Sequence, residues 1–255
     1  MATALVTGGT SGIGAAFARQ LAARGDALVL VARDAARLEE SAARLREAYG
    51  VEVEVLPADL ADRGSVLRVA DRLTDVTRPV DLLVNNAGFG VHHALTDPDP
   101  GPHEHAVDVM IRAVLLLGGA AGWAMRERGH GAVVNVASTA GFMTMGSYSA
   151  VKAWVMTYSE SLANELHGTG VTVTALAPGW VRTEFHERAA IRTSSIPEVL
   201  WLDADALVAE CLADVARGAV VSIPSRRYRA LMWAVRHAPR PAVRAASRRL
   251  SSSRH

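Results

Sequence analysis

Residues 7–14 read Thr-Gly-Gly-Thr-Ser-Gly-Ile-Gly and stand between an apolar run at 2–7 and an amphipathic pattern at 13–24. The run has the unbroken hydrophobicity of a buried parallel strand, and the pattern after the glycines predicts a helix. Glycines at 8, 12 and 14 allow a tight turn and a close approach to a pyrophosphate, which the helix N-terminus would stabilise. This order of elements predicts a dinucleotide site, and the alternative is a tight connection that binds nothing.

The rest of the chain continues the alternation of strand and helix. Apolar runs predict further strands at 27–32, 51–56, 80–85, 132–138, 171–177 and 219–223. Periodic stretches between them predict helices at 34–49, 62–75, 104–128, 147–167 and 203–217. The alternation predicts an α/β fold with a Rossmann-like, doubly wound, seven-stranded parallel sheet and helices on both faces. We expect residues 1–224 to form a single Rossmann-type domain, with a lid at about 183–202.

Composition is that of a globular protein and excludes a disordered chain: 50% of the 255 residues are hydrophobic and 21% are charged. The one cysteine, Cys211, excludes an internal disulfide, fits a reducing compartment and is expected as a buried structural thiol in a helix. The N-terminus has no basic leader, and the longest apolar run, 113–125, is too short and too interrupted by glycine to span a bilayer. We therefore expect a soluble cytoplasmic protein. The histidines show no metal-ligand spacing, so no metal site is expected.

Tyr148 and Lys152 stand four residues apart in the predicted helix 147–167, so they share one of its faces. Lys152 is the only lysine in the chain, and every other residue among the 27 lysines and arginines is arginine. Arginine stays protonated, whereas lysine is a compact charge with a tunable pKa, and a positive charge beside a phenol favours the phenolate. A lone lysine one turn after a tyrosine therefore indicates chemistry rather than a surface charge.

Five motifs follow one another along the chain. They are the Thr-Gly-x-x-x-Gly-x-Gly turn at 7–14, Asn-Asn-Ala-Gly at 85–88, Ser138 after the fifth predicted strand, Tyr-x-x-x-Lys at 148–152 and Pro-Gly at 178–179. This set resembles the classical short-chain dehydrogenase/reductase family over residues 2–223. The set is highly specific although no single motif is, and the glycine pattern and length suit the classical branch rather than the longer epimerase-like branch.

The resemblance implies three catalytic residues. Tyr148 would be the general acid that protonates the carbonyl oxygen during reduction, or the base in the reverse direction. Lys152 would lower the pKa of Tyr148 and hydrogen-bond the nicotinamide ribose, and Ser138 would polarise the substrate oxygen. The nicotinamide would supply the hydride. The alternatives are a core aromatic, a snorkelling lysine and a serine that caps a turn, and the ordered set disfavours all three.

Cofactor choice depends on the end of the second predicted strand, where enzymes of this fold that prefer NAD carry an acid for the ribose 2′-hydroxyl. Here Ala32 is followed by Arg33, whose guanidinium fork suits a 2′-phosphate. NADP is therefore favoured over NAD; the alternative is that Arg33 only begins a solvated helix and that Asp34 weakens a phosphate site. The resemblance assigns the following residues to the cofactor: Thr7, Gly8, Thr10, Ser11, Gly12, Ile13, Gly14, Arg33, Asp59, Leu60, Asn86, Ala87, Gly88, Tyr148, Lys152, Pro178, Gly179, Val181 and Thr183.

One position departs from the family pattern. The resemblance places an asparagine in the helix before the fifth strand, where it helps to hold a water that links the lysine to solvent. This chain has Met110 there, and no asparagine occurs between Asn86 and Asn135. A thioether cannot donate and accepts only weakly. We therefore expect a proton relay that runs through backbone groups and water, or a weak one, and expect Met110→Asn to keep or raise turnover.

The substrate pocket is expected to be apolar. Its predicted walls follow the Asn-Asn-Ala-Gly motif, lie between Ser138 and Tyr148, or come from the lid: Phe89, His92, His93, Phe142, Met143, Met145, Trp180, Phe185, His186 and Trp201. Such walls suit an apolar carbonyl better than a sugar or a charged acid. The alternative is that several of them are ordinary core residues, and for Trp201 the two interpretations are evenly balanced.

The C-terminal residues differ in charge from the rest of the chain. Residues 215–255 hold ten arginines and no acid, whereas residues 1–214 hold 17 basic and 26 acidic residues, a net charge of −9. Apolar residues at 228, 231, 232 and 235 predict a basic amphipathic helix at 226–237, ended by Pro239 and Pro241, and residues 242–255 are expected to be frayed. Packing on the body or on a second subunit is favoured over contact with an anionic membrane surface. Nucleic-acid binding is not expected, because no reader module is present.

Together these features predict an NADP(H)-dependent oxidoreductase that transfers a hydride between nicotinamide and an apolar ketone or aldehyde, or a secondary alcohol. The resemblance also implies a homodimer or homotetramer formed through the helices at 104–128 and 147–167. A second class is a cofactor-binding regulatory or scaffold protein with weakened catalysis. Met110 favours that class, whereas Ser138, Tyr148 and Lys152 argue against it.

Overall fold

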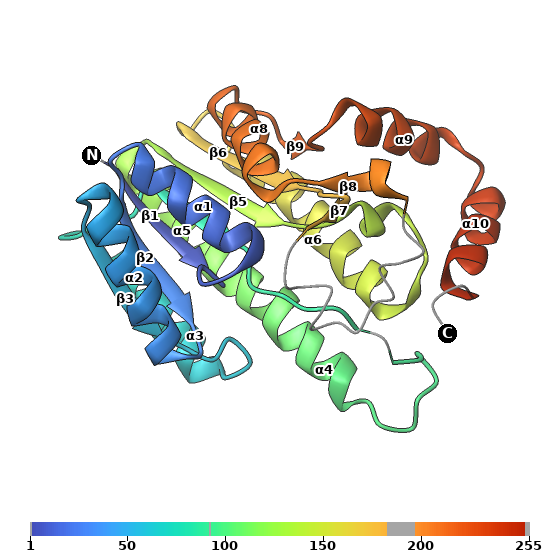
Figure 1. Cartoon of the computed structure of the whole chain (residues 1–255), viewed down its shortest axis with the longest axis horizontal. Coiled ribbons are helices and arrows are strands. Elements are labelled where there is room, and N and C mark those ends of the chain that lie inside the picture. Colours follow the sequence, from blue (N-terminus) through green and yellow to red (C-terminus); the bar gives the residue numbers. More distant parts are fainter. Residues whose placement is uncertain (1, 92, 183–196, 253–255) are drawn as a thin grey trace.

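The computed structural model describes residues 2–91, 93–182 and 197–252. Its centre is a seven-stranded parallel sheet with the order β3-β2-β1-β4-β5-β6-β9 (Figure 1). Every strand that an apolar run predicts is present, with ends that move by at most two residues. The strands are β1 (Thr3–Thr7), β2 (Ala27–Ala32), β3 (Val53–Pro57), β4 (Leu82–Asn85), β5 (Gly131–Val136), β6 (Val171–Leu176) and β9 (Val221–Ser222).

The strand order reverses at β1, which pairs with β2 on one side and β4 on the other. All pairings in this sheet are parallel, so the carboxyl ends of its strands lie at one edge. Open α/β sheets bind ligands in the crevice outside the carboxyl ends of the strands at such a reversal. The glycine-rich turn follows β1 and the Asn-Asn-Ala-Gly motif ends β4, so two of the predicted motifs lie at this point.

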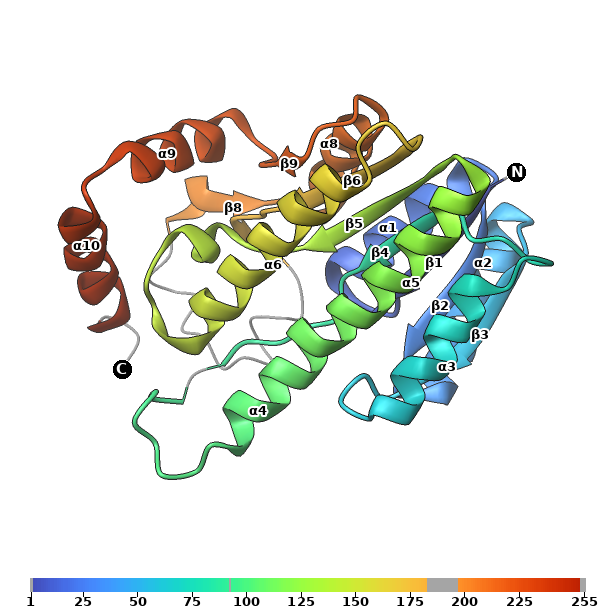
Figure 2. The same ribbon diagram turned by 180° about the vertical axis from the view of Figure 1, so that it is seen from behind.

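Helices cover both faces of the sheet, as the doubly wound prediction requires. Figure 1 shows α1 and α8 on one face, and Figure 2 shows α3, α5 and α6 on the other. The hydrophobic core is divided accordingly: α1, α2 and α8 contribute to one buried cluster, and α3, α5 and α6 to a second. The helices are α1 (Gly12–Ala23), α2 (Ala35–Tyr49), α3 (Arg63–Thr74), α4 (Gly101–Val107), α5 (Ala113–Arg128), α6 (Gly146–Glu165), α8 (Ala204–Ala216), α9 (Arg226–His237) and α10 (Arg240–Ser252).

The longest helical stretch runs without a break from Gly101 to Arg128 and contains a π-helical turn, Asp108–Arg112, between α4 and α5. By length and composition alone this 28-residue stretch could cross a membrane, with a mean hydropathy of 1.5 in its most apolar window. This stretch is longer than the apolar run at 113–125, because the helix extends beyond the run at both ends. Its apolar character has another explanation: side chains such as Leu117 and Met125 are buried in the second core cluster.

The C-terminal arm, which we define as residues 226–252, corrects one prediction. α9 spans the predicted residues and buries Tyr228 on the body of the protein. Residues 240–252, most of which were expected to be frayed, form the helix α10. Pro241 does not prevent this helix because it occupies the first turn, where the missing N–H costs no intrahelical bond. The two prolines mark the boundary between two helices rather than the end of ordered structure.

Most of the predicted lid lies outside the described residues. Its described end contains a short 3-10 helix, Glu198–Leu200, and the two-residue strand β8, Trp201–Leu202. β8 pairs in parallel with β7, Trp180–Val181, and forms a second small sheet. This sheet was not predicted, because two-residue strands produce no periodic signal.

Candidate active site

Thr7 joins the two loops that follow β1 and β4. Its Oγ1 donates to the carbonyl of Val84 at 3.3 Å and accepts the backbone N–H groups of Asn86 and Ala87 at 2.9 and 3.0 Å. Asn86 in turn donates its side-chain amide to the carbonyls of Thr7 and Gly8. The glycine-rich turn and the Asn-Asn-Ala-Gly loop are therefore one hydrogen-bonded unit.

Two glycines of the turn are required by this close packing. Gly8 has a φ of +66°, a conformation that favours glycine, and a Cβ there would lie 2.9 Å from Asn86 Nδ2. A Cβ on Gly14 would lie 2.5 Å from the same nitrogen. Ser11, the N-cap residue of α1, makes no side-chain capping bond within the described chain. The turn thus leads into a helix N-terminus whose first N–H groups lack intrahelical partners, and this cradle fits a pyrophosphate.

Arg33 and Asp34, which were expected to determine the preference for NADP or NAD, lie beside this turn, at the end of β2. Gly8 donates its N–H to the carbonyl of Val31 at 2.7 Å, and Arg33 stands exposed two residues further along. The carboxylate of Asp34 is used elsewhere, because its Oδ1 caps α2 by accepting the N–H of Arg37 at 3.0 Å. The remaining described cofactor residues follow the expected strands: Asp59 and Leu60 after β3, Gly88 after β4, Pro178 and Gly179 after β6, and Val181 in β7.

Tyr148 and Lys152 lie one turn apart on α6. Lys152 is only 5% exposed, and its Nζ donates to the carbonyl of Val136, the last residue of β5, at 2.8 Å. The same nitrogen lies 5.8 Å from the centre of the Tyr148 ring. The amino group therefore stands near both the end of β5 and the phenol.

Burial lowers the pKa of Lys152 from 10.5 to about 8, because desolvation disfavours the ammonium form. The Val136 carbonyl accepts a hydrogen bond from Lys152 but carries no counter-charge. An ammonium in such a place interacts strongly with a negative charge that forms nearby, since little water screens it. The arrangement can stabilise a phenolate at Tyr148, and it is costly to the folded protein when no anion is present.

Ser138 follows β5 and caps the 3-10 helix Thr139–Phe142. Its Oγ accepts the N–H of Ala140 at 3.1 Å, so the capping role is present in the structure. That bond uses a lone pair of the hydroxyl and leaves its proton to be donated to a substrate oxygen. Thr139 connects this turn to the Pro-Gly motif, because its N–H and its hydroxyl donate to the carbonyl of Pro178 at 3.0 and 3.1 Å.

Met110 lies in the π-helical turn and is 1% exposed. A Cβ on Gly88 would lie 3.1 Å from the Met110 sulfur and 3.7 Å from Lys152 Nζ, so the thioether and the amino group both approach Gly88. In the π turn Ala113 donates its N–H to the carbonyl of Asp108, five residues back, which interrupts the α-helical ladder. π turns are frequent at functional sites. A relay through backbone groups and water is compatible with this interruption and stays a prediction.

The predicted pocket residues do not all have the same surroundings. Phe89 stacks on His105 with ring centres 4.9 Å apart, and Trp180 faces Trp201 at 6.1 Å across the β7–β8 pair. Phe142 packs against a third core cluster, built from α6 and β6. These contacts give Phe142 a packing role, as the alternative interpretation of the sequence allowed.

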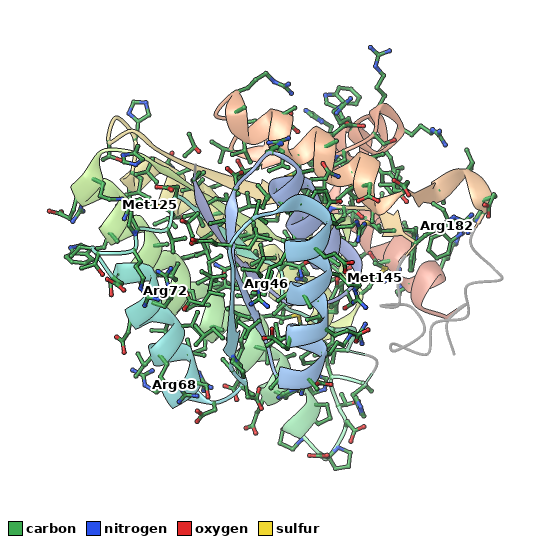
Figure 3. The ribbon with its side chains drawn as sticks, turned by 60° about the vertical axis from the view of Figure 1, so that its left-hand side comes forward. Arg46, Arg68, Arg72, Met125, Met145 and Arg182 are labelled. Carbon is green, nitrogen blue, oxygen red and sulfur yellow. The ribbon has the colours of Figure 1, made fainter. Side chains whose placement is uncertain are left out.

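The loop before α6 and the segment after β7 lie on one side of the molecule. Figure 3 shows Met145 and Arg182, one from each segment, on the side opposite Arg68 and Arg72 of α3. Met145 is partly exposed, as is Met143. Four predicted site residues lie outside the described residues: His92, Thr183, Phe185 and His186.

A buried polar chain beside the site was not predicted. Asn85 donates its side-chain amide to Asn135 at 2.9 Å, Asn135 donates to Ser159 at 3.0 Å, and Ser159 donates to the carbonyl of Val155 at 2.7 Å. None of the three donors is more than 4% exposed. The chain fixes α6 against β4 and β5. The sequence did contain a signal for this chain: Asn135 lies inside the apolar run 132–138, and a buried amide needs hydrogen-bond partners.

His103, in α4, lies beside the start of α6. Its Nδ1 lies 2.9 Å from the hydroxyl of Ser147, the residue before Tyr148, and its Nε2 lies 2.9 Å from the carbonyl of Ala94. A carbonyl only accepts, so Nε2 carries a proton. The imidazole therefore ties the loop after β4 to the start of α6. No sequence spacing predicts this contact, because it joins residues 44 positions apart.

Known proteins share this fold and these motifs. The short chain dehydrogenase family model matches residues 2–192. Galactitol 2-dehydrogenase (L-tagatose-forming) of Cereibacter sphaeroides is 35% identical over 209 residues, which cover 79% of each chain. A short-chain dehydrogenase from Sphingobium yanoikuyae, solved in complex with NADPH, is 37% identical with a TM-score of 0.84 and covers 92% of this chain and 94% of that one. The bulky-bulky ketone specific alcohol dehydrogenase from Comamonas testosteroni is 34% identical with a TM-score of 0.79 and covers 92% of each chain.

The chain belongs to the short-chain dehydrogenase/reductase family. It is an oxidoreductase of the kind that transfers a hydride to or from a nicotinamide cofactor. The predicted family, the doubly wound fold and the enzyme class are thereby confirmed.

Proposed function

We propose that this enzyme uses NADP(H) to interconvert apolar ketones or aldehydes and the corresponding alcohols, with Tyr148 as the acid and base. The buried ammonium of Lys152 carries this proposal. It lies near the Tyr148 ring, and it donates a hydrogen bond to the neutral carbonyl of Val136. A charge with so little compensation favours the phenolate of Tyr148, which makes the phenol a better proton donor.

The side chains act on the carbonyl oxygen of the substrate. When bound, the nicotinamide supplies the hydride for reduction or accepts it in oxidation. Tyr148 gives its proton to the oxygen as negative charge develops there, and Ser138 donates its hydroxyl proton to the same oxygen. Lys152 then faces a phenolate, whose charge compensates its own. In the reverse direction, the phenolate takes the proton from the alcohol.

The preference for NADP rests on Arg33. It is exposed beside the glycine-rich turn, and Asp34 is engaged in capping α2. The Sphingobium relative was solved with NADPH, which supports the same choice. Arg33→Ala should weaken NADPH binding about tenfold and leave NADH binding unchanged, a loss that corresponds to about 1.4 kcal/mol. Arg24→Ala, on the loop before β2, is the matched control, and an equal loss for both cofactors would contradict the assignment.

An apolar substrate is supported by the aromatic and sulfur-containing residues near the site and by the ketone specificity in the name of the Comamonas relative. The Cereibacter relative is named for a polyol, so the two relatives point to different substrates. A substrate panel should therefore include aliphatic and aryl ketones, aldehydes and a keto sugar. We expect the bulky apolar ketones to give the highest kcat/KM.

The decisive experiment follows NADPH oxidation with this panel in the wild type and in Tyr148→Phe. Tyr148→Phe should lose about 10²- to 10⁴-fold in kcat, the range expected for a positioned general acid. Tyr158→Phe is the matched control, because Tyr158 lies on the same helix but donates to the carbonyl of Leu115. Tight NADPH binding without turnover of any carbonyl would instead favour a cofactor-binding regulatory or scaffold protein.

We also propose that two copies associate through α5 and α6. Leu115 and Trp123 on α5 are 46% and 51% exposed, and they lie two turns apart on one face. Trp154 and Tyr158 of α6 stack with ring centres 4.9 Å apart, beside the Leu115 carbonyl. Trp123→Glu should shift the mass in analytical ultracentrifugation toward the monomer, and an unchanged mass would exclude this face.

A further inference from the structure

The C-terminal arm crosses two segments that border the proposed substrate site. α9 and α10 run along the end of the molecule at which α6 begins, as both views show (Figures 1 and 2). α9 contacts the 3-10 helix that Ser138 caps, where Arg236 lies over the Phe142 ring at 5.8 Å. The arm is therefore next to the residues that lead from Ser138 to Tyr148.

Ser247 of α10 makes the contact that matters most. It is 1% exposed, and its Oγ accepts the backbone N–H of Thr144 at 3.1 Å. Thr144 lies between Met143 and Met145, in the loop that joins Ser138 to Tyr148. Val243, one turn before Ser247 on the same side of α10, is also buried. A residue 103 positions further along the chain thus holds the middle of this loop.

Tyr228 of α9 holds the second segment. Its hydroxyl donates to the carbonyl of Leu200 at 2.7 Å and accepts the N–H of Trp180 at 3.0 Å. Its ring lies against Gly179, so closely that a Cβ there would overlap the ring. The β7–β8 pair and the Pro-Gly motif therefore depend on α9 for their position. The arm connects both segments through one continuous stretch of chain.

We propose that Ser247 is a positioning residue for the substrate: by holding the N–H of Thr144 it fixes the loop between Ser138 and Tyr148. The proposal rests on the proposed function, because the loop matters only if those two residues act on the substrate. A loop whose backbone is tied at its centre presents Met143 and Met145 in one arrangement, and the substrate does not have to order it on binding. The cofactor cradle, built on β1 and β4, does not use this bond.

Because this hydrogen bond holds the loop and not the cofactor cradle, its loss should change the kinetics with the carbonyl substrate and leave cofactor binding unchanged. Ser247→Ala removes the acceptor with little change in size, so the protein should stay folded. The kcat/KM for the best carbonyl substrate should fall about threefold to tenfold, the value of one neutral hydrogen bond, and the change should be mainly in KM. The Kd for NADPH should stay within about twofold of the wild type. Ser247→Thr keeps the acceptor oxygen and should recover most of the loss.

Amide exchange supplies a readout that is independent of turnover. In Ser247→Ala, hydrogen–deuterium exchange in the peptide around Thr144 should be faster than in the wild type by about the same factor. Arg248→Ala is the matched control, because it changes an exposed neighbour on the same helix. The wild type and this control should be alike in both measurements.

The outcomes separate this proposal from the proposed function. Faster exchange around Thr144 with an unchanged kcat/KM would overturn the positioning role, as would unchanged exchange. A loss of NADPH affinity as large as the loss in kcat/KM would show a general structural defect and would also overturn it. If the wild type turns over no carbonyl, the proposed function fails, whereas the exchange result still decides whether Ser247 holds the loop.

Discussion

Replacing Lys152 with methionine should make the protein more stable while removing the amino group that we propose acts in the reaction. The fall in the pKa of Lys152 from 10.5 to about 8 measures how much folding disfavours the ammonium. At about 1.4 kcal/mol for each tenfold change in proton affinity, burial of this charge costs about 3 kcal/mol at neutral pH. Methionine has nearly the same length and no charge. It loses the bond to the Val136 carbonyl, worth about 1–2 kcal/mol, so the net gain should be about 1–2 kcal/mol.

The sign of the pH dependence follows from the direction of the pKa shift. Below pH 8 the lysine is charged in both the folded and the unfolded chain, so the full cost is present. Between pH 8 and 10.5 the folded state has lost its proton and the unfolded state keeps it, so wild-type stability from this group rises with pH. The advantage of Lys152→Met should therefore shrink by about 2 kcal/mol between pH 6.5 and 9.5 and be gone at the higher pH.

Urea denaturation of both proteins without cofactor, at pH 6.5 and 9.5, measures this difference. Comparison at equal pH cancels the titration of other groups, such as the Cys211 thiol, whose pKa burial raises to about 12. Arg72→Met is the matched control: Arg72 is 8% exposed and paired with Glu54 at 2.9 Å, so its loss should destabilise equally at both pH values. A Lys152→Met protein that is less stable than the wild type at pH 6.5, or a gap that does not change with pH, would refute the reasoning.

Three further changes test other parts of the site. Met110→Asn should keep or raise kcat, measured with NADPH and the best carbonyl, and a large loss with an intact fold would show that the thioether is needed. Thr7→Val leaves the N–H groups of Asn86 and Ala87 without their acceptor and should cost about 2–4 kcal/mol in urea denaturation. Thr7→Ser keeps the hydroxyl and should cost much less, and a Thr7→Val protein as stable as the wild type would contradict the role of the hydroxyl. Gly179→Ala should lower the melting temperature because the new methyl group overlaps the ring of Tyr228, and a double-mutant cycle with Tyr228→Ala should recover much of the loss; additive losses would contradict this contact.

The relative positions of the cofactor motifs could be predicted because the sheet is parallel. In a parallel sheet the carboxyl ends of the strands meet at one edge, so motifs that follow the first, fourth and fifth strands must be neighbours. Thr7 and Asn86 belong to two of these motifs, and the structure joins them by hydrogen bonds. Because the sheet brings these motifs together, hydrogen bonds can form between them, such as the one that the Asn86 N–H donates to Thr7 Oγ1.

The substrate side was less predictable because its contacts do not follow from the sheet. Phe142, expected in the pocket wall, also packs against a core cluster, and an aromatic side chain in a loop has no period that reveals its direction. Residues 242–255 were expected to be frayed because they are rich in arginine and serine. Their buried positions, Val243 and Ser247, become favourable only when the loop that holds Thr144 is present to receive them.

The amino-acid sequence by itself determined the order of strands and helices, the glycine-rich turn and the Tyr148–Lys152 pair, because these depend on local periodicity and on residue chemistry. Only the tertiary structure decided the burial of Lys152, the π turn at Met110 and the return of α10 onto the loop before α6. Each of these joins segments far apart in the chain. Their energies come from desolvation and from buried hydrogen bonds, which exist only after the chain has folded.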